Sequence, residues 1–146
     1  MTRRLSLPTA RPTTVDAVRK QLGGRAATDA GAGEVVSFRD ERGSERMGVV
    51  LFVRGEDLDV WVEGDLVRRV RRRDTQAPDG VVSRELVAVA RDAQGFAKLE
   101  EGQRVRYQHA GGLGDGALVE KCRFGGLVER DDRKVLGIGF RRLLAG

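Results

Sequence analysis

Short runs of β-branched and aromatic residues, separated by charged or glycine-containing turns, occur twice in this chain of 146 residues. The first set covers residues 33–73 and reads GEVVSF, RMGVVLFV, LDVWVEG and LVRRV. The second covers residues 102–144 and reads GQRVRYQ, GALVEKCRF, GLVERDD and KVLGIGFRRLL. Short strands in quick succession, joined by such turns, are typical of small antiparallel sheets or barrels. The two sets therefore predict two small β units.

The order of features agrees between the two sets, which indicates an internal duplication. Aligning GEVVSF with GQRVRY, and GVVLFVRG with GALVEKCRFG, brings similar residues together. The aligned pairs are Gly33 with Gly102, Val36 with Val105, Phe38 with Tyr107, and Gly48 with Gly116. The last match pairs VRRV with FRRL.

VRRV and FRRL each place two polar residues between two apolar ones, which breaks strand alternation. Such a break predicts a bulge or one tight helical turn that closes the unit. The apolar residues expected in the cores are Val67, Val70, Phe140 and Leu143. Those expected to point outward are Arg68, Arg69, Arg141 and Arg142. Only Arg71, Arg72 and Arg73 are then left for a further role.

Two helical segments are expected outside the β units. Residues 13–24 predict a short helix with Val15, Val18 and Leu22 on one face. Residues 83–94 predict a second helix with Ser83 as its N-cap. Its apolar positions are Leu86, Val89, Ala90, Ala93 and Ala97. The first twelve residues, with two prolines and three arginines, predict a flexible basic arm.

The repeated meander, opened by Gly-x-x-Val-x-aromatic, resembles the SH3-like small barrels, especially the Tudor, KOW and CarD-type modules of transcription and translation proteins. The KOW resemblance rests on one glycine per unit, Gly48 and Gly116, and the CarD-type resemblance on GQRVRYQHAGGLGDGALVE. The resemblance implies a mainly β fold with two small SH3-like antiparallel barrels joined by a helix, a short N-terminal helix and a flexible basic arm. It assigns no recognition residue to a particular position.

The expected organisation has four parts. Residues 1–32 form the basic arm with its short helix, and residues 33–80 the first SH3-like barrel. Residues 81–101 form the connecting helix, and residues 102–146 the second SH3-like barrel.

The composition argues against several classes of protein. No apolar run approaches the roughly 20 residues needed to cross a bilayer, and the N-terminus does not resemble a secretory signal. A single cysteine, Cys122, allows no internal disulfide and suits a reducing cytoplasm. One cysteine and one histidine, His109, cannot supply a zinc site by themselves. No GxSxG or similar nucleophile motif is present, so His109 is expected to be a structural loop histidine rather than a catalytic base. We therefore expect a cytoplasmic, non-enzymatic protein with no cofactor, metal or small-molecule substrate.

The charge favours a polyanionic partner. The chain has 27 basic and 22 acidic residues, for a net charge of +5. By segment the net charge is +4 for residues 1–32, −2 for 33–80, −1 for 81–101 and +4 for 102–146. Arginine, which suits bidentate phosphate contacts, outnumbers lysine 23 to 4. The alternative explanation for this excess is a GC-rich genome, which favours arginine codons without any selection for binding.

The first functional hypothesis is a protein that contacts DNA, RNA or a nucleic-acid-associated protein through its arm and second barrel. Alternation places Arg104 with Arg106, and Lys121 with Arg123, on common faces. The candidate nucleic-acid-binding residues are Arg3, Arg4, Arg11, Arg19, Lys20, Arg71, Arg72, Arg73, Arg104, Arg106, Lys121, Arg123, Arg141 and Arg142. Tyr107 and Phe124 either stack on bases or pack in the core.

The second hypothesis is a protein–protein adaptor or regulatory scaffold that uses two barrels of opposite charge, with a homo-oligomer as one possible assembly. The acidic loop 56–65 would then be a recognition surface for a basic partner. Trp61 is either an anchor residue of that surface or part of the core.

Overall fold

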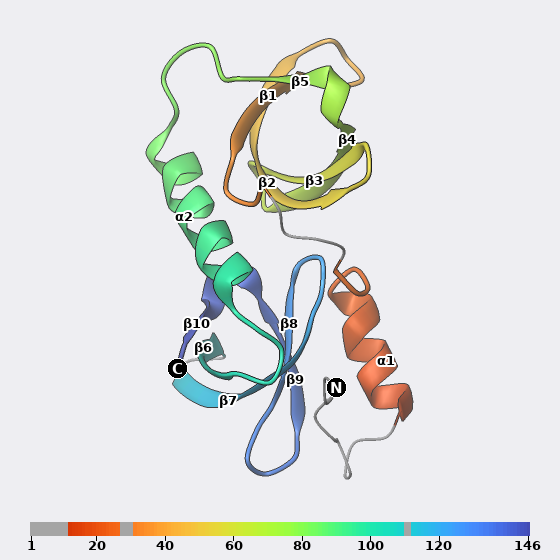
Figure 1. The fold of residues 1–146 in the computed structure, drawn as a ribbon, viewed down its shortest axis with the longest axis vertical. Helices are drawn as coiled ribbons and strands as arrows, with labels where there is room; N and C mark the ends of the chain where they lie inside the picture. The colour runs from red at the N-terminus through yellow and green to blue at the C-terminus, as the bar shows by residue number, and fades with distance from the viewer. Residues whose placement is uncertain (1–11, 27–30, 110–111) are drawn as a thin grey trace. The chain divides into compact units, whose positions relative to one another are not determined.

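The computed structural model describes residues 12–26, 31–109 and 112–146. The chain divides into two compact units, which we call the inserted unit (Ala27–Ala97) and the split unit (Met1–Ala26 with Lys98–Gly146). Each contains a five-stranded antiparallel sheet, so the predicted mainly β fold with an N-terminal and a connecting helix is confirmed (Figure 1). The predicted basic arm, with Arg3, Arg4 and Arg11, lies outside the described residues.

The sheet of the inserted unit is a meander whose last strand returns to the first. Its strands are β1 (Val35–Arg39), β2 (Glu45–Arg54), β3 (Asp57–Val62), β4 (Leu66–Arg71) and β5 (Thr75–Gln76). They lie in the order β4-β3-β2-β1-β5. A 3-10 turn, η1 (Arg72–Asp74), separates β4 from β5. Helix α2 (Arg84–Lys98) follows the sheet.

The sheet of the split unit has the same plan. Its strands are β6 (Arg104–His109), β7 (Gly112–Lys121), β8 (Gly125–Glu129), β9 (Val135–Gly139) and β10 (Leu143–Ala145). Their order, β10-β6-β7-β8-β9, is that of the inserted unit read from the other edge. The 3-10 turn η2 (Phe140–Arg142) precedes β10. Helix α1 (Pro12–Gln21) is the N-terminal element.

The predicted glycine and valine pairs occupy equivalent positions. Val36 lies opposite Gly48 in one sheet, and Val105 lies opposite Gly116 in the other. A Cβ atom on Gly48 or Gly116 would lie 2.5 Å from a carbonyl oxygen of the next strand, so both positions exclude a side chain. Both sheets also shift register two residues after this glycine. This close agreement confirms the first part of the alignment, which pairs the first two strands of each repeat.

Gly33 and Gly102 begin the two repeats in the same way. Their φ angles are +88° and +96°, a backbone conformation that favours glycine. The N–H of Gly33 donates to the carbonyl oxygen of Val50 at 2.7 Å, and that of Gly102 donates to Leu118 at 2.6 Å. The glycine at this position therefore starts the first strand of each unit against its second strand.

The predicted match of VRRV with FRRL is wrong. VRRV lies wholly within β4, a regular strand, whereas FRRL contains η2. The segment equivalent to residues 140–143 is therefore 72–75, which holds η1 and the first residue of β5. Strand alternation along β4 places Arg68 on the same face of the sheet as Val70. Arg68 is therefore half-buried rather than fully outward, and it forms an ion pair with Glu41. The sequence VRRV was assigned to a turn because two arginines between valines fit a turn as well as a strand.

The apolar residues of these segments are nevertheless inside. Phe140 and Leu143 are buried, and Val70 packs against the core of the inserted unit. Val67 is half-buried. Arg69, Arg141 and Arg142 are exposed, as predicted.

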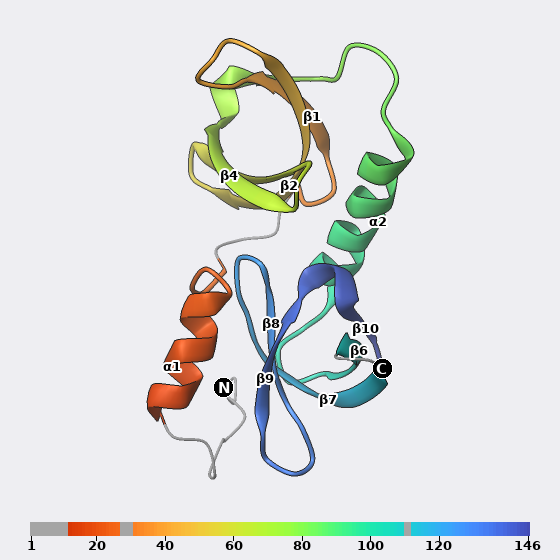
Figure 2. The ribbon, with the colours of Figure 1, turned by 180° about the vertical axis from the view of Figure 1, so that it is seen from behind.

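Helix α1 packs on the sheet of the split unit, beside β9 (Figure 2). Its predicted apolar face is confirmed: Val15 and Leu22 join a buried cluster, and Val18 packs against it. The sheet contributes Val119, Cys122 and Leu127 to this cluster. The two parts of the split unit therefore share one core.

Helix α2 begins where predicted and ends later. The Ser83 hydroxyl accepts a hydrogen bond from the Leu86 N–H at 3.2 Å, which confirms the N-cap. Gly95 does not end the helix, since the helix continues to Lys98 and buries Phe96 against Phe52. Within the described residues, no helix combines the length and apolar character needed to cross a membrane.

Candidate nucleic-acid interface

Arg19, a predicted phosphate ligand on α1, is bound within the split unit. Its Nε and Nη2 donate to the two carboxylate oxygens of Glu120 on β7, at 2.7 and 3.1 Å. Its Nη1 donates to Asp16 on the same helix. Since these carboxylates use most of the guanidinium, Arg19 contributes to the docking of α1. The adjacent Lys20 is exposed.

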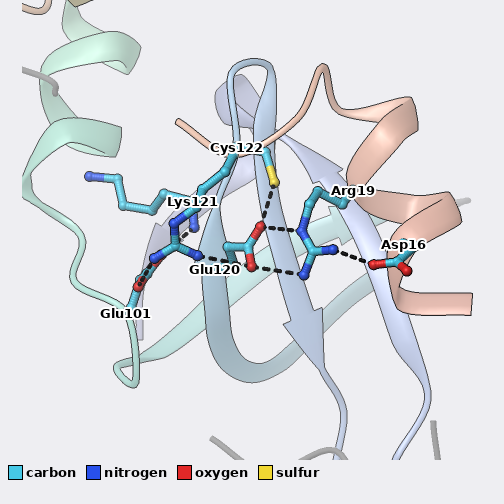
Figure 3. A network of polar contacts seen from close by, with 7 residues as sticks. Asp16, Arg19, Glu101, Glu120, Lys121 and Cys122 are labelled. Carbon is cyan, nitrogen blue, oxygen red and sulfur yellow. Dashed lines mark hydrogen bonds and ion pairs between the residues drawn. The ribbon is translucent and has the colours of Figure 1, made fainter. Parts of the chain in front are cut away.

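Glu120 is the centre of a polar network (Figure 3). Its side chain is only 2 % exposed, and Arg25 approaches its Oε1 at 3.1 Å. Burial alone raises the pKa of Glu120, but hydrogen bonds from Arg19 and the charges of both arginines outweigh it and leave the pKa below its ordinary value. The hydrogen bond to Glu120 in turn raises the pKa of Arg19. Both groups are therefore charged, and they join the N-terminal segment to the sheet.

Backbone contacts strengthen this attachment. The N–H of Arg123 donates to the carbonyl oxygen of Gly24, and that of Phe124 to Leu22. Cys122, which directly precedes Arg123 in the chain, is fully buried, and its thiol lies 3.7 Å from a carboxylate oxygen of Glu120. Burial, together with the nearby carboxylate, raises the pKa of Cys122 to about 12, so the thiol is neutral and unreactive in place.

Glu120 was not identified from the sequence as the carboxylate that attaches the N-terminal segment to the sheet. The available signal was a glutamate in an otherwise apolar strand, GALVEKC. A charge at such a position needs a partner when it is buried. The sequence does not indicate where that partner lies, because Arg19 is 101 residues away along the chain.

Lys121 and Arg123 do not form the predicted stripe along one strand. Strand β7 ends at Lys121, so Arg123 lies beyond it. The Nζ of Lys121 donates to the carbonyl oxygen of Leu99 at 3.1 Å. The guanidinium of Arg123 lies 5.2 Å from the ring centre of Phe124. Both cations are half-buried and take part in contacts of the split unit.

Arg104 and Arg106 do share the exposed face of β6, as predicted. Arg104, however, forms ion pairs with Asp115 at 3.4 Å and with Asp131 at 3.2 Å. Arg106 lies opposite Asp115 in the strand register. The positive charge of this face is therefore largely balanced by its own carboxylates.

Five of the exposed predicted cations lie in or beside the 3-10 turns η1 and η2. We call Arg71–Asp74 and Phe140–Arg142 the basic turns. Arg71, Arg72 and Arg73 are exposed and form no ion pair with any other described residue. Arg141 and Arg142 are exposed at the equivalent place in the split unit. Exposed arginines thus recur at one structural position, directly after the fourth strand of each sheet.

Each unit also has a hollow beside the aromatic residue of its first strand. The hollow of the inserted unit, about 470 Å³, lies between β4 and the turn after β1, next to Phe38. We call it the basic hollow because four arginines line it: Arg39, Arg68, Arg69 and Arg71. Its carboxylates are Asp40, Glu41 and Asp74.

The hollow of the split unit, about 530 Å³, lies next to Tyr107 and has the opposite charge balance. Its lining includes one arginine, Arg130, with Asp115, Asp131 and Asp132. Each of these aspartates is held by an arginine, Arg104 or Arg130. His109 also lines this hollow. The net charges of the sequence segments therefore do not predict the charges of the two hollows.

The described residues contain no group of three His, Cys, Asp or Glu side chains that could hold a metal ion. In comparisons with known proteins, no protein-family model matches the sequence, and no curated protein gives a significant match.

Proposed function

We propose that this chain is a non-enzymatic binding protein that contacts nucleic acid through its two basic turns, in association with the transcription or translation machinery. The observation that supports this most directly is the recurrence of exposed arginines at the same place in both units. An exposed arginine can simply be hydrated. Exposed arginines that recur after the fourth strand of both units favour a common binding role. Guanidinium groups bind phosphate oxygens bidentately.

The resemblance to SH3-like barrels supports the same proposal. We propose that each five-stranded sheet is one small SH3-like barrel, since β5 pairs with β1 and β10 pairs with β6 after a single 3-10 turn. In that arrangement the basic turns lie between the last two strands, outside the core. Binding there leaves the folded core unchanged.

The adaptor hypothesis has less support from the residues it invoked. Trp61 is 2 % exposed, and its indole N–H donates to Asp65 at 2.8 Å. Asp59, in the middle of the acidic segment, is buried between Arg54 and Arg69. These groups stabilise the inserted unit. The acidic side chains of this segment that remain accessible are the exposed Glu56 and Glu63, the half-buried Asp57, and Asp65, which is exposed but accepts the Trp61 indole N–H.

The test is to measure the affinity of labelled oligonucleotides by fluorescence anisotropy, at low salt and over a salt series. Reversing two charges in one basic turn, as in Arg72→Glu/Arg73→Glu or Arg141→Glu/Arg142→Glu, should weaken binding about tenfold or more at low salt, because phosphate neutralisation drives it. If four phosphates are contacted, the logarithm of the association constant should fall with a slope of about −3 to −4 against log salt.

The matched control is Arg84→Glu/Arg91→Glu, which makes the same change in net charge at exposed positions of α2. Equal weakening by this control would assign binding to net charge rather than to the basic turns, and a wild-type protein that binds no oligonucleotide at low salt would refute the proposal. Substitutions are preferable to deleting the N-terminus, because residues 12–26 carry α1 and the partners of Glu120.

A further inference from the structure

We propose that the basic hollow of the inserted unit receives one unstacked base, so that the nucleic acid bound by this chain is single-stranded. This inference rests on the function proposed above and names its ligand more narrowly. It starts from Arg71, which both lines the hollow and begins the basic turn. A strand whose phosphates contact Arg72 and Arg73 has its neighbouring nucleotide beside the hollow.

The size and wall of the hollow suit a base. Its volume of about 470 Å³ lies within the range of roughly 300–1,000 Å³ usual for small-molecule sites. Phe38 and Val70 supply apolar surface, and both belong to or pack against the core, so this wall is rigid. Planar guanidinium groups around it can stack on the face of any base.

The charges of the lining distinguish a base from a phosphate. Arg68 is paired with Glu41 at 3.3 Å and Arg69 with Asp59 at 3.9 Å, whereas Arg71 has no ion pair among the described residues. Asp40 is occupied by the backbone N–H groups of its own turn. Glu41 and Asp74 also line the hollow. Their carboxylates repel a phosphate and can accept hydrogen bonds from the amino group of a base.

A duplex cannot use this site, because its bases are paired and stacked. Simple electrostatic attraction favours the opposite choice, since a duplex has the higher charge density and releases more counterions per contact. A preference for a single strand therefore cannot come from the basic turns alone. The preference for a single strand over a duplex therefore measures how much the hollow contributes to binding.

The experiment compares three labelled probes at equal concentration and salt: a 12-nucleotide oligo(dC), an abasic oligomer of the same length, and a 12-base-pair duplex. Oligo(dC) should bind about tenfold or more tightly than the abasic strand, because stacking of one base contributes that much. It should also bind more tightly than the duplex. The variant Glu41→Gln/Asp74→Asn tests the hollow itself.

This variant makes the hollow more positive, so attraction to phosphate alone predicts tighter binding of all three probes. The proposal predicts instead that the advantage of oligo(dC) over the abasic strand decreases. The control Asp131→Asn/Asp132→Asn makes the same charge change at the hollow of the split unit and should leave that advantage unchanged. Equal affinity for oligo(dC) and the abasic strand, or a preference for the duplex, overturns the inference and leaves the proposed function in place. Failure of every probe to bind at low salt overturns both.

Discussion

Glu120→Gln should release the N-terminal segment from the split unit. The substitution keeps the size of the side chain and removes the charge that Arg19 and Arg25 share. Both arginines then face a neutral amide in a place where the carboxylate was 2 % exposed. The backbone contacts of residues 22–26 remain, so the expected effect is a more frequent local opening of α1.

The magnitude follows from the exposure of the partners. Removing one member of a fully buried ion pair costs about 3–5 kcal/mol. Here the side chains of Arg19 and Arg25 are 27 % and 61 % exposed, so solvent screens part of the interaction. A cost of about 2 kcal/mol is therefore expected, which corresponds to about a 30-fold larger population of the open form.

Cys122 provides the assay, because it is the only cysteine and is fully buried beneath α1. Its rate of reaction with a thiol reagent should rise about 30-fold in Glu120→Gln, in line with the opening equilibrium. Glu129→Gln is the matched control: this glutamate is also buried, but its carboxylate lies 3.8 Å from Nη1 of Arg133, beyond hydrogen-bond distance. Equal labelling rates in the wild type and in Glu120→Gln would refute the assigned role of the ion pair.

Three further predictions concern stability. The pKa of Glu120 is lower in the folded than in the unfolded chain, so its contribution to the unfolding free energy is present above its ordinary pKa of 4.5 and is lost as the pH falls toward the folded pKa. The difference in unfolding free energy between the wild type and Glu120→Gln should therefore shrink below pH 4.5. A difference that stays constant in acid titrations would contradict this. Gly116→Ala should destabilise the split unit by about 1–3 kcal/mol in urea unfolding, since its Cβ would lie 2.5 Å from a carbonyl oxygen. Gly95→Ala, inside α2 with no atom within 4 Å of its Cβ, should instead stabilise the inserted unit by about 0.5–1 kcal/mol.

The duplicated sheets could be predicted because their signals are local. A glycine with positive φ, a valine three residues after it and a second glycine against the next strand recur in the same order. Each residue type reflects a backbone requirement of its own position. The cap of α2 is local in the same sense, since Ser83 bonds to a residue three positions away.

The contacts that decide which cations are accessible are not local. Arg19 looked like a phosphate ligand because its partner is 101 residues away. Arg104 looked unpaired because Asp131, which forms an ion pair with it, lies on a different hairpin. The predicted match of VRRV with FRRL was wrong for another reason. A pair of arginines between apolar residues fits both a strand and a 3-10 turn. Sequence patterns thus located the candidate arginines without showing which ones the fold neutralises.

The division of the split unit between the two ends of the chain affects how the protein is made. During synthesis α1 leaves the ribosome well before β6–β10 exist, and a helix of ten residues is unstable in isolation. The inserted unit is continuous in sequence, so it can fold while translation continues. The split unit acquires its shared core only after the last strands emerge, which makes the inserted unit the natural first intermediate on the ribosome.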